Sequence, residues 1–297
     1  MPRPTPTLDR HGATACLSDT AAATPATATT PAARATLASS AAPTTSAAPA
    51  TPATPATSAA RRPRRWLLMG VFALGATLAG SLAAASELRP FQVSYVWVWH
   101  GATVALSSLE LTHRQDDIWA YTSSTGPRGI GRLYPMRPHL QSIMRIGAQG
   151  VQPLHFVATG SGRRHDAHVD FDWDAGRITG TYEGAKVDMP TQAGVQDDLS
   201  VQIALLVQLL AGKTPDKALE INKDAVREYV YRREGEQTLD TALGSIDTIV
   251  YAIHHPGSPR TTRFWCAPSK NFIPMQAQQK RIDSVEWTMR IESLTIQ

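Results

Sequence analysis

The stretch FQVSYVWVW at residues 91–99 decides the fold of this chain. Its large apolar residues recur at every second position. Because successive side chains of an extended strand point to opposite faces, this period of two predicts a β-strand. The same alternation returns as far as the C-terminus, with glycines between the runs as turn residues. Further strands are predicted at 103–111, 118–121, 139–146, 153–159, 167–173, 177–182, 227–233, 238–243, 246–254, 260–265, 273–280 and 285–296.

One segment breaks this alternation and predicts a helix at about 197–212. Asp197, Asp198 and Ser200 precede the apolar run VQIALLVQLL, and acidic or hydroxyl side chains at that point cap the first turn of a helix. Gly212 and Pro215 follow the run and are typical stop signals. We therefore interpret the two aspartates and the serine as a structural helix cap.

The predicted helix is apolar on nearly every side, relieved only by Gln202 and Gln208. A helix of this kind must be enclosed by other elements. The short connections between the strands favour antiparallel pairing. We therefore expect a mainly β protein in which a strongly curved, open-barrel-like antiparallel sheet encloses this one helix.

The N-terminal part has a different composition. Residues 1–60 consist mostly of Ala, Thr, Pro and Ser, which predicts a disordered tail, or upstream sequence included by a misplaced start. Residues 61–85 combine an arginine cluster, an uncharged apolar run at 66–84 and a small-residue end, which is the pattern of a secretory signal. The alternative is an uncleaved membrane anchor.

Either interpretation exports residues 86–297, which we expect to form a single β-rich domain. With a cleaved signal the domain is periplasmic. With an anchor it stays attached to the inner membrane and faces the periplasm, and 66–84 is its only membrane contact.

The charge distribution argues against nucleic acid as a partner. The chain has a net charge of +4, but seven arginines and only two acidic residues lie in residues 1–65. From residue 86 onward, 22 basic residues face 23 acidic ones, so the exported domain is close to neutral. Nucleic-acid binding requires a clustered basic face, which this balance disfavours.

Motifs for catalysis are missing from the sequence. It contains no HExxH, paired CxxC, GxSxG or P-loop pattern, and Cys266 beside Trp265 is interpreted as a small buried hydrophobe. We therefore name no catalytic residue and predict no cofactor. A hydrolase is the third hypothesis for function. It has the least support, because it requires a nucleophile and a base that no motif displays.

An acidic run at residues 166–174 suggests a cation site but does not fit one. The run alternates polar and apolar residues, and Gly176, which follows it, comes one position too late for a calcium loop. His165 and His168 point to opposite faces of such a strand. We interpret the polar side as a solvent-facing surface and predict no metal. This side consists of Asp166, His168, Asp170, Asp172 and Asp174.

The tryptophans are the candidate ligand-binding residues, namely Trp97, Trp99, Trp119 and Trp265. Aromatic side chains on the concave side of a wide curved sheet are able to hold an apolar ligand. The first hypothesis for function is therefore a periplasmic module that binds or carries an apolar, lipid-like or amphipathic envelope molecule. The alternative is a non-catalytic structural or protein-interaction module of the envelope, with a fully packed interior and another envelope protein as its partner.

Four segments in order resemble the domain-of-unknown-function 3108 family of bacterial envelope proteins. They are QDDLS at 196–200, YVWVWHG at 95–101, VQPLHF at 151–156 followed by FDW at 171–173, and FWCAP at 264–268 followed by FIPM at 272–275. The resemblance covers roughly residues 90–295. It implies an exported, largely antiparallel β domain and brings no established activity, substrate or catalytic residue.

Overall fold

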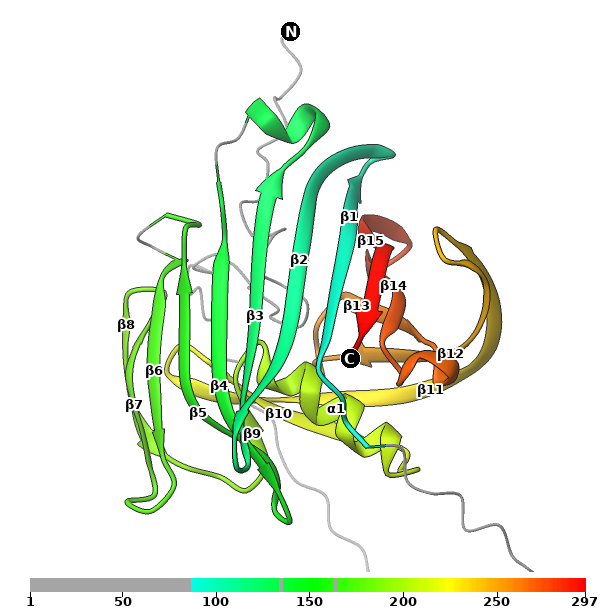
Figure 1. The fold of residues 1–297 in the computed structure, drawn as a ribbon. Coiled ribbons are helices and arrows are strands. Elements are labelled where there is room, and N and C mark those ends of the chain that lie inside the picture. The colour runs from blue at the N-terminus through cyan, green and yellow to red at the C-terminus, as the bar shows by residue number, and fades with distance from the viewer. Residues whose placement is uncertain (1–86, 134–135, 163–164) are drawn as a thin grey trace, which may run out of the picture. The chain divides into compact units, whose positions relative to one another are not determined.

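The computed structural model describes residues 87–133, 136–162 and 165–297. Within these residues fifteen strands form a single sheet (Figure 1). Neighbouring strands are antiparallel apart from β9 and β10, which are parallel. The protein is therefore mainly β, as the alternating sequence predicts.

The first eight strands form one half of the sheet. They are β1 (Phe91–Trp99), β2 (Ala102–Gln115), β3 (Ile118–Pro127), β4 (His139–Gly147), β5 (Gly150–Thr159), β6 (Ala167–Asp172), β7 (Arg177–Tyr182) and β8 (Ala185–Pro190). A short 3-10 helix, η1 (Gly129–Leu133), follows β3.

The remaining strands form the other half. They are β9 (Val195–Gln196), β10 (Lys217–Asn222), β11 (Ala225–Thr241), β12 (Gly244–His254), β13 (Arg260–Cys266), β14 (Pro274–Arg281) and β15 (Ser284–Ile296). A second 3-10 helix, η3 (Pro268–Lys270), lies between β13 and β14.

Each half is a meander, and the two halves join where β1 pairs with β15. This pairing sets Phe91 opposite Ile296, so the first and last strands lie side by side in the middle of the sheet. The outer edges are β8 and β9, which are not paired with each other. The sheet is therefore large and open, and its ladder does not close into a barrel.

The sheet is strongly curved. Strands β1 to β5 run upright in Figure 1, whereas β11 and β12 run across the view. Register shifts interrupt several ladders, among them those at Ser94/Tyr95, Trp97/Val98 and Arg233/Gly235. Such bulges bend a strand and increase its twist, which gives a physical reason for the curvature.

The α-helix of the described residues is α1 (Ser200–Leu210). Gly212 adopts φ +69° just after it, and the backbone N–H of Lys213 bonds the carbonyl of Gln208 at 2.9 Å. This left-handed glycine ends the helix in a Schellman motif, where the sequence predicts the stop. The helix contacts β5, β9 and β10, and seven of its eleven residues are buried.

The strand pattern differs from the sequence prediction in two respects. Strands β8, β9 and β10 were not among the predicted strands. The predicted strands 227–233 and 238–243 are one strand, β11, because Gly235 forms a bulge at φ +128° and pairing with β12 continues on both sides of it. The rule that turn glycines end strands therefore failed where the glycine forms a bulge.

The predicted tail at 1–60 and the predicted leader at 61–85 lie outside the described residues. Within the described part of the chain, no helix has the length and apolar character needed to cross a membrane.

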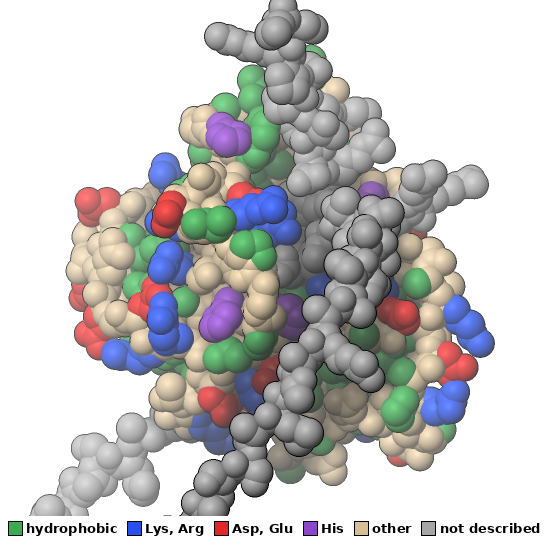
Figure 2. Space-filling view, turned by 180° about the vertical axis from the view of Figure 1, so that it is seen from behind, with side chains coloured by type: hydrophobic (Ala, Val, Ile, Leu, Met, Phe, Trp, Pro, Cys, Tyr) green, Lys and Arg blue, Asp and Glu red, His purple; other side chains and the backbone are tan. Residues whose placement is uncertain are grey.

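On the face seen in Figure 2, Lys and Arg side chains are interspersed with Asp and Glu side chains.

Candidate functional site: a buried acidic junction at the start of the helix

Asp197 anchors the start of α1. It is fully buried, and its Oδ1 accepts hydrogen bonds of 2.8 Å from the backbone N–H groups of both Leu199 and Ser200. Ser200 in turn accepts at its Oγ from the Asp197 N–H at 2.8 Å. The other carboxylate oxygen of Asp197 accepts from Ser142 Oγ on β4 at 2.7 Å. One side chain therefore holds both the first turn of the helix and the sheet.

Asp198 is bound to a different strand. Its carboxylate accepts from the hydroxyl of Tyr182, at the end of β7, at 2.7 and 2.8 Å. Both side chains are buried, at 4% exposure each. Adjacent aspartates thus connect the helix start to β4 and to β7, so that α1 is held against the half of the sheet that contains β1 to β8.

Glu220 on β10 completes the junction from the other half of the sheet. It is 1% exposed and lies in hydrogen-bonding contact with Asp198. Neither Glu220 oxygen has a donor when both carboxyls are ionised. A proton on Glu220 supplies the missing donor, and burial together with the negative charges of Asp198 and Asp197 raises its pKa well above the usual range. Burial and the neighbouring negative charges therefore favour the neutral form of Glu220.

The pKa values of the aspartates move in the same direction. Burial raises the pKa of Asp198 to about 7, against the hydrogen bond from Tyr182 that lowers it. Burial also raises the pKa of Asp197, and the hydrogen bonds from Ser142, Ser200 and Leu199 oppose that rise. The Tyr182 hydroxyl keeps its proton, because burial and the charge of Asp198 raise its pKa. The carboxyl groups of the junction therefore stay protonated to higher pH than exposed carboxyl groups do.

Gln196 connects the edge strand β9 to β5. Its Nε2 donates to the Val151 carbonyl at 2.8 Å, and its own strand position pairs with Glu220 across the parallel ladder. The Oε1 of Gln196 and the Oδ1 of Asn222 are buried acceptors without a protein donor. The curve of the sheet therefore brings the edge strand β9 next to β5, which is separated from the other edge strand, β8, by β6 and β7. A side-chain hydrogen bond, and not a backbone ladder, connects β9 with β5.

The chemistry of the junction is that of a proton-sharing carboxyl pair. General acid or base catalysis requires such a group to reach a substrate, and the exposure of Asp198 and Glu220 is 4% and 1%. In this conformation both carboxyl groups are shielded from solvent, and their contacts are with other residues of the protein. These contacts link the start of α1 to Tyr182 on β7 and to Glu220 on β10.

The four predicted tryptophans lie in separate surroundings. Trp97 is buried on β1, donates from Nε1 to Ser107 Oγ at 2.6 Å and contacts Trp287 at 5.0 Å between ring centroids, with the two rings tilted by 52°. Trp265 is buried on β13 and donates to Gln237 at 2.8 Å.

Trp99 and Trp119 are partly buried. Their ring contacts are with His100 at 4.5 Å and His113 at 4.7 Å, respectively. Each of the four tryptophans therefore has its own partner, and the ring contacts described here do not join any two of them.

Trp97 belongs to a buried band that crosses six strands. Ser107 also bonds Thr125 at 2.5 Å, and beyond Trp287 the band continues through hydrogen bonds of 2.9 and 3.2 Å. In order across β3, β2, β1, β15, β14 and β13, its members are Thr125, Ser107, Trp97, Trp287, Gln279 and Thr262. The band places polar groups inside the sheet with most of their hydrogen bonds satisfied.

A separate hollow of about 430 Å³ lies beside η1. Its Val96 neighbours Trp97 on β1, so their side chains point to opposite faces. Arg128 and Glu292 in the hollow form an ion pair of 2.9 Å. The lining residues are Val96, Thr103, Arg128, Gly129, Arg132 and Glu292.

The sequence model of a family described as "Protein of unknown function (DUF3108)" matches residues 90–285. The chain belongs to this family. The DUF3108 match includes the helix α1 and every residue of the acidic junction. No curated protein sequence matches the chain.

Among solved structures, the DUF3108 chain is similar to a beta-barrel-like protein of the domain of unknown function DUF1849 from Brucella abortus. The TM-score is 0.50 and the identity 13%, over 71% of this chain and 99% of that one. This similarity shows the fold alone.

Two further structures have TM-scores of 0.30 and cover 71% of this chain and 97% of their own. One is described as a lipoprotein from Parabacteroides distasonis, at 9% identity, and the other as an exported protein with a YmcC-like fold from Bacteroides fragilis, at 10%.

Sequence reasoning located part of the junction. It interpreted Asp197, Asp198 and Ser200 as a cap of the helix, which begins at Ser200. Asp197 does accept from the N–H groups at the helix start, whereas the carboxylate of Asp198 accepts from Tyr182 on β7. It missed Glu220 and Tyr182, which lie 22 residues after and 16 residues before Asp198. The alternation in LEIN at 219–222 indicates a strand but assigns Glu220 and Asn222 to its solvent-facing side, whereas the structure buries both.

Proposed function

We propose that residues 86–297 form an exported envelope module that binds one apolar or amphipathic molecule between α1 and the curved sheet. The predicted leader at 61–85 supports the export, and N-terminal sequencing of the purified protein distinguishes a cleaved signal from an anchor. A mature protein that begins at Ser86 fits cleavage, whereas one that keeps residues 66–84 fits the anchor.

The observation that carries the proposal is the uneven attachment of α1. At its start, polar side chains bind it to β4, to β7 and to its own first turn. Further along, residues 203–210 are apolar except for Gln208, so nonpolar contacts hold this part. Nonpolar contacts are not directional. Contacts between this part of the helix and the sheet can therefore be replaced by contacts between the helix and an acyl chain. The helix then turns about its start while the junction stays intact.

The unpaired edges of the sheet support such a movement. Because β8 and β9 do not share a ladder, the curve widens without breaking ladder hydrogen bonds between them, and the side-chain bond from Gln196 to the Val151 carbonyl of β5 opens in this movement. In this proposal Trp97, Trp99 and Trp119 are the aromatic residues that border the widened space. Trp265, also predicted from the sequence as a ligand-binding residue, lies three positions after Thr262 on β13 and therefore faces the other side of the sheet. Aromatic side chains are common in such sites because they offer large apolar area with little loss of conformational freedom.

A second function is favoured by one observation. Trp97 and Trp265 are only 5% and 7% exposed, and each donates a hydrogen bond within the protein. Side chains that are already packed and bonded suit a filled interior, which is the alternative of a non-catalytic structural or protein-interaction module.

Binding of a fluorescent apolar probe separates the two functions. We expect the exported domain to bind 1-N-phenylnaphthylamine at one site per chain, and Leu206→Trp to weaken this binding by filling space beside the helix. Leu243→Trp is the matched control, because it adds the same side chain at a leucine that is 37% exposed. Absence of saturable binding, together with native mass spectra free of lipid, contradicts the proposal and favours the structural module.

A further inference from the structure

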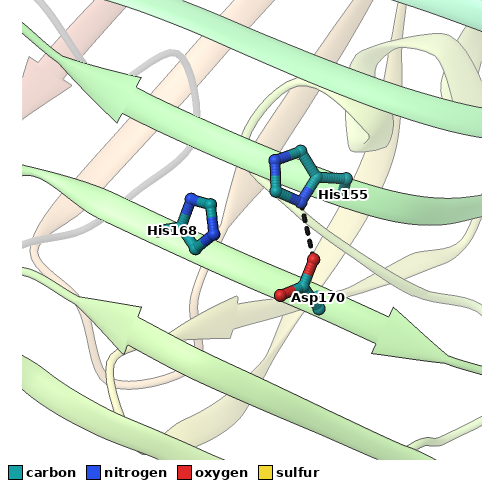
Figure 3. A group of neighbouring side chains, drawn as sticks. All are labelled: His155, His168 and Asp170. Carbon is teal, nitrogen blue, oxygen red and sulfur yellow. Dashed lines mark hydrogen bonds and ion pairs between the residues drawn. The ribbon is translucent and has the colours of Figure 1, made fainter.

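Two histidines and an aspartate gather on the outer face of β5 and β6 (Figure 3). His155 on β5 is the cross-strand partner of Asp170 on β6, and His168 comes two residues before Asp170. The Nδ1 of His155 lies 2.6 Å from Oδ1 of Asp170, and the two imidazole rings are 4.7 Å apart. Each residue offers one ligand atom, and all three atoms lie within 4.8 Å of one another.

The alternation of the strands puts these side chains together. Val169 and Phe171 of β6 are buried, as is Phe156 of β5, so the residues between them point away from the core. His155 and Asp170 keep 34% and 57% of their side-chain surface exposed, and His168 is exposed as well. Ions in solution therefore reach all three side chains.

We propose that His155, His168 and Asp170 bind one divalent transition-metal ion, with Zn²⁺ as the representative ion. Imidazole nitrogen and carboxylate oxygen are its ordinary ligands, at about 2.0–2.2 Å from the metal. Ligand atoms around one tetrahedral ion lie about 3.3 Å apart, which follows from that bond length. Rotation of the exposed side chains brings the group to this spacing.

The surroundings of the group favour a cation. The cross-strand partners on β7 are uncharged, with Thr179 opposite Asp170 and Thr181 opposite His168. On β4 the partner of His155 is Ile143. The nearby basic side chains Arg177 and Lys186 both pair with Asp188. Their charges are thus partly neutralised, and no positive side chain stands in the adjacent cross-strand positions of the described strands.

The three protein ligands leave a fourth position of a tetrahedral ion for water or for a ligand atom from another molecule. The metal site and the acidic junction lie on opposite faces of the strands. This inference does not depend on the proposed apolar ligand.

Calorimetric titration of the metal-free protein with ZnCl₂ at pH 7.5 tests the proposal. We expect one ion per chain with a dissociation constant of about 10 μM or lower. Each of His155→Ala, His168→Ala and Asp170→Ala is expected to weaken binding by at least about tenfold. The control His139→Ala removes an exposed histidine of β4 that bonds Ser124, and it is expected to leave binding unchanged.

A second measurement identifies the ligands directly. Electron paramagnetic resonance of the Cu²⁺-loaded protein is expected to show nitrogen coupling from two imidazoles, and from one in either histidine variant. Thermal unfolding in a chelator checks that the variants fold. Binding weaker than about 10 μM, or equal loss of binding in the His139→Ala control, overturns the proposal.

Discussion

Carboxyl groups gather at two places in this molecule and meet opposite surroundings. At the start of α1, Asp197, Asp198 and Glu220 are buried among strands from both halves of the sheet. On β5 and β6, Asp170 shares an exposed face with two histidines. The chemical groups are similar, but burial raises the pKa of the first set and makes its hydrogen bonds structural.

The difference teaches that acidity along the sequence does not identify a binding site. The acidic run at 166–174 looks the more functional of the two, whereas the QDDLS segment looks like an ordinary helix cap. In the fold the cap becomes a junction between distant strands. The acidic run gains its proposed role only through His155, which belongs to another strand.

Removing the central carboxylate of the junction has the largest expected effect. Asp197→Ala leaves the N–H groups of Leu199 and Ser200 and the hydroxyl of Ser142 without their acceptor. We expect the free energy of unfolding to fall by about 3 kcal/mol, since each hydrogen bond to a charged group contributes about 1.5–3 kcal/mol and the losses overlap. Denaturant unfolding measures the loss. The exposed counterpart Asp170→Ala is expected to stay within about 0.5 kcal/mol, and equal losses would erase the contrast.

The pH dependence of stability is the next largest effect. Unfolded carboxyls titrate near pH 4, whereas in the folded protein the pKa of Asp198 is about 7 and that of Glu220 is raised. Between these values the folded state binds more protons than the unfolded state. The free energy of unfolding is therefore greatest at the acidic end and falls as pH rises through 7.

We expect a loss on the order of 2 kcal/mol between pH 5 and pH 8, measured by urea unfolding. Glu220→Gln keeps the shape of the side chain but does not titrate, so it is expected to flatten this dependence. Asp172→Asn on the exposed face is expected to leave it unchanged. Two results would contradict this account of the buried carboxyl groups. One is a free energy of unfolding that rises between pH 5 and pH 8, and the other is an unaltered pH dependence in Glu220→Gln.

Removing the tyrosine donor has a smaller expected effect. Tyr182→Phe deletes the hydroxyl that donates to Asp198 and leaves the ring in the core. We expect a loss of about 1.5 kcal/mol and a further rise in the pKa of Asp198, because the bond to its charged form is gone. Tyr95→Phe serves as the comparison, because it removes a hydroxyl that donates to a neutral acceptor, the backbone carbonyl of Pro274, at 2.9 Å. An unchanged stability in Tyr182→Phe would mean that the bond contributes nothing.

The smallest expected effect is that of His155→Ala in the absence of metal. Its side chain is exposed by 34% and bonds only the exposed Asp170 among the hydrogen bonds described here. We expect a change within about 0.5 kcal/mol by thermal or urea unfolding in a chelator. A loss as large as that of the junction variants would mean that the outer face also holds the fold together.

The sequence predicts the local parts of this fold well, because local parts depend on neighbouring residues. Alternation in 91–99 places β1, and Gly212 ends the helix where it is predicted to end. Pairing of β1 with β15 joins residues about 200 positions apart, which no local period reveals. The same limit hides Glu220, whose partner Asp198 reaches it only through the curve of the sheet.

Two features of single residues also escaped sequence reasoning for physical reasons. Gly235 looks like a turn residue, yet it forms a bulge inside β11 because the pairing with β12 continues past it. His155 stands in a strand with mixed surroundings and no acidic neighbours, and its relation to Asp170 is set by the register of β5 and β6. Enclosure of α1 by the sheet, expected from its apolar sequence, remains part of the proposed function.

The central claim is that the start of α1 is a buried junction that holds protons near neutral pH. The most direct test is a carbon-detected NMR titration of the side-chain carboxyl groups between pH 3 and pH 9. The account predicts one aspartate carboxyl with a pKa of about 7, which disappears in Asp198→Asn and persists in Asp170→Asn. Titration of every carboxyl near its ordinary value of about 4 would contradict it.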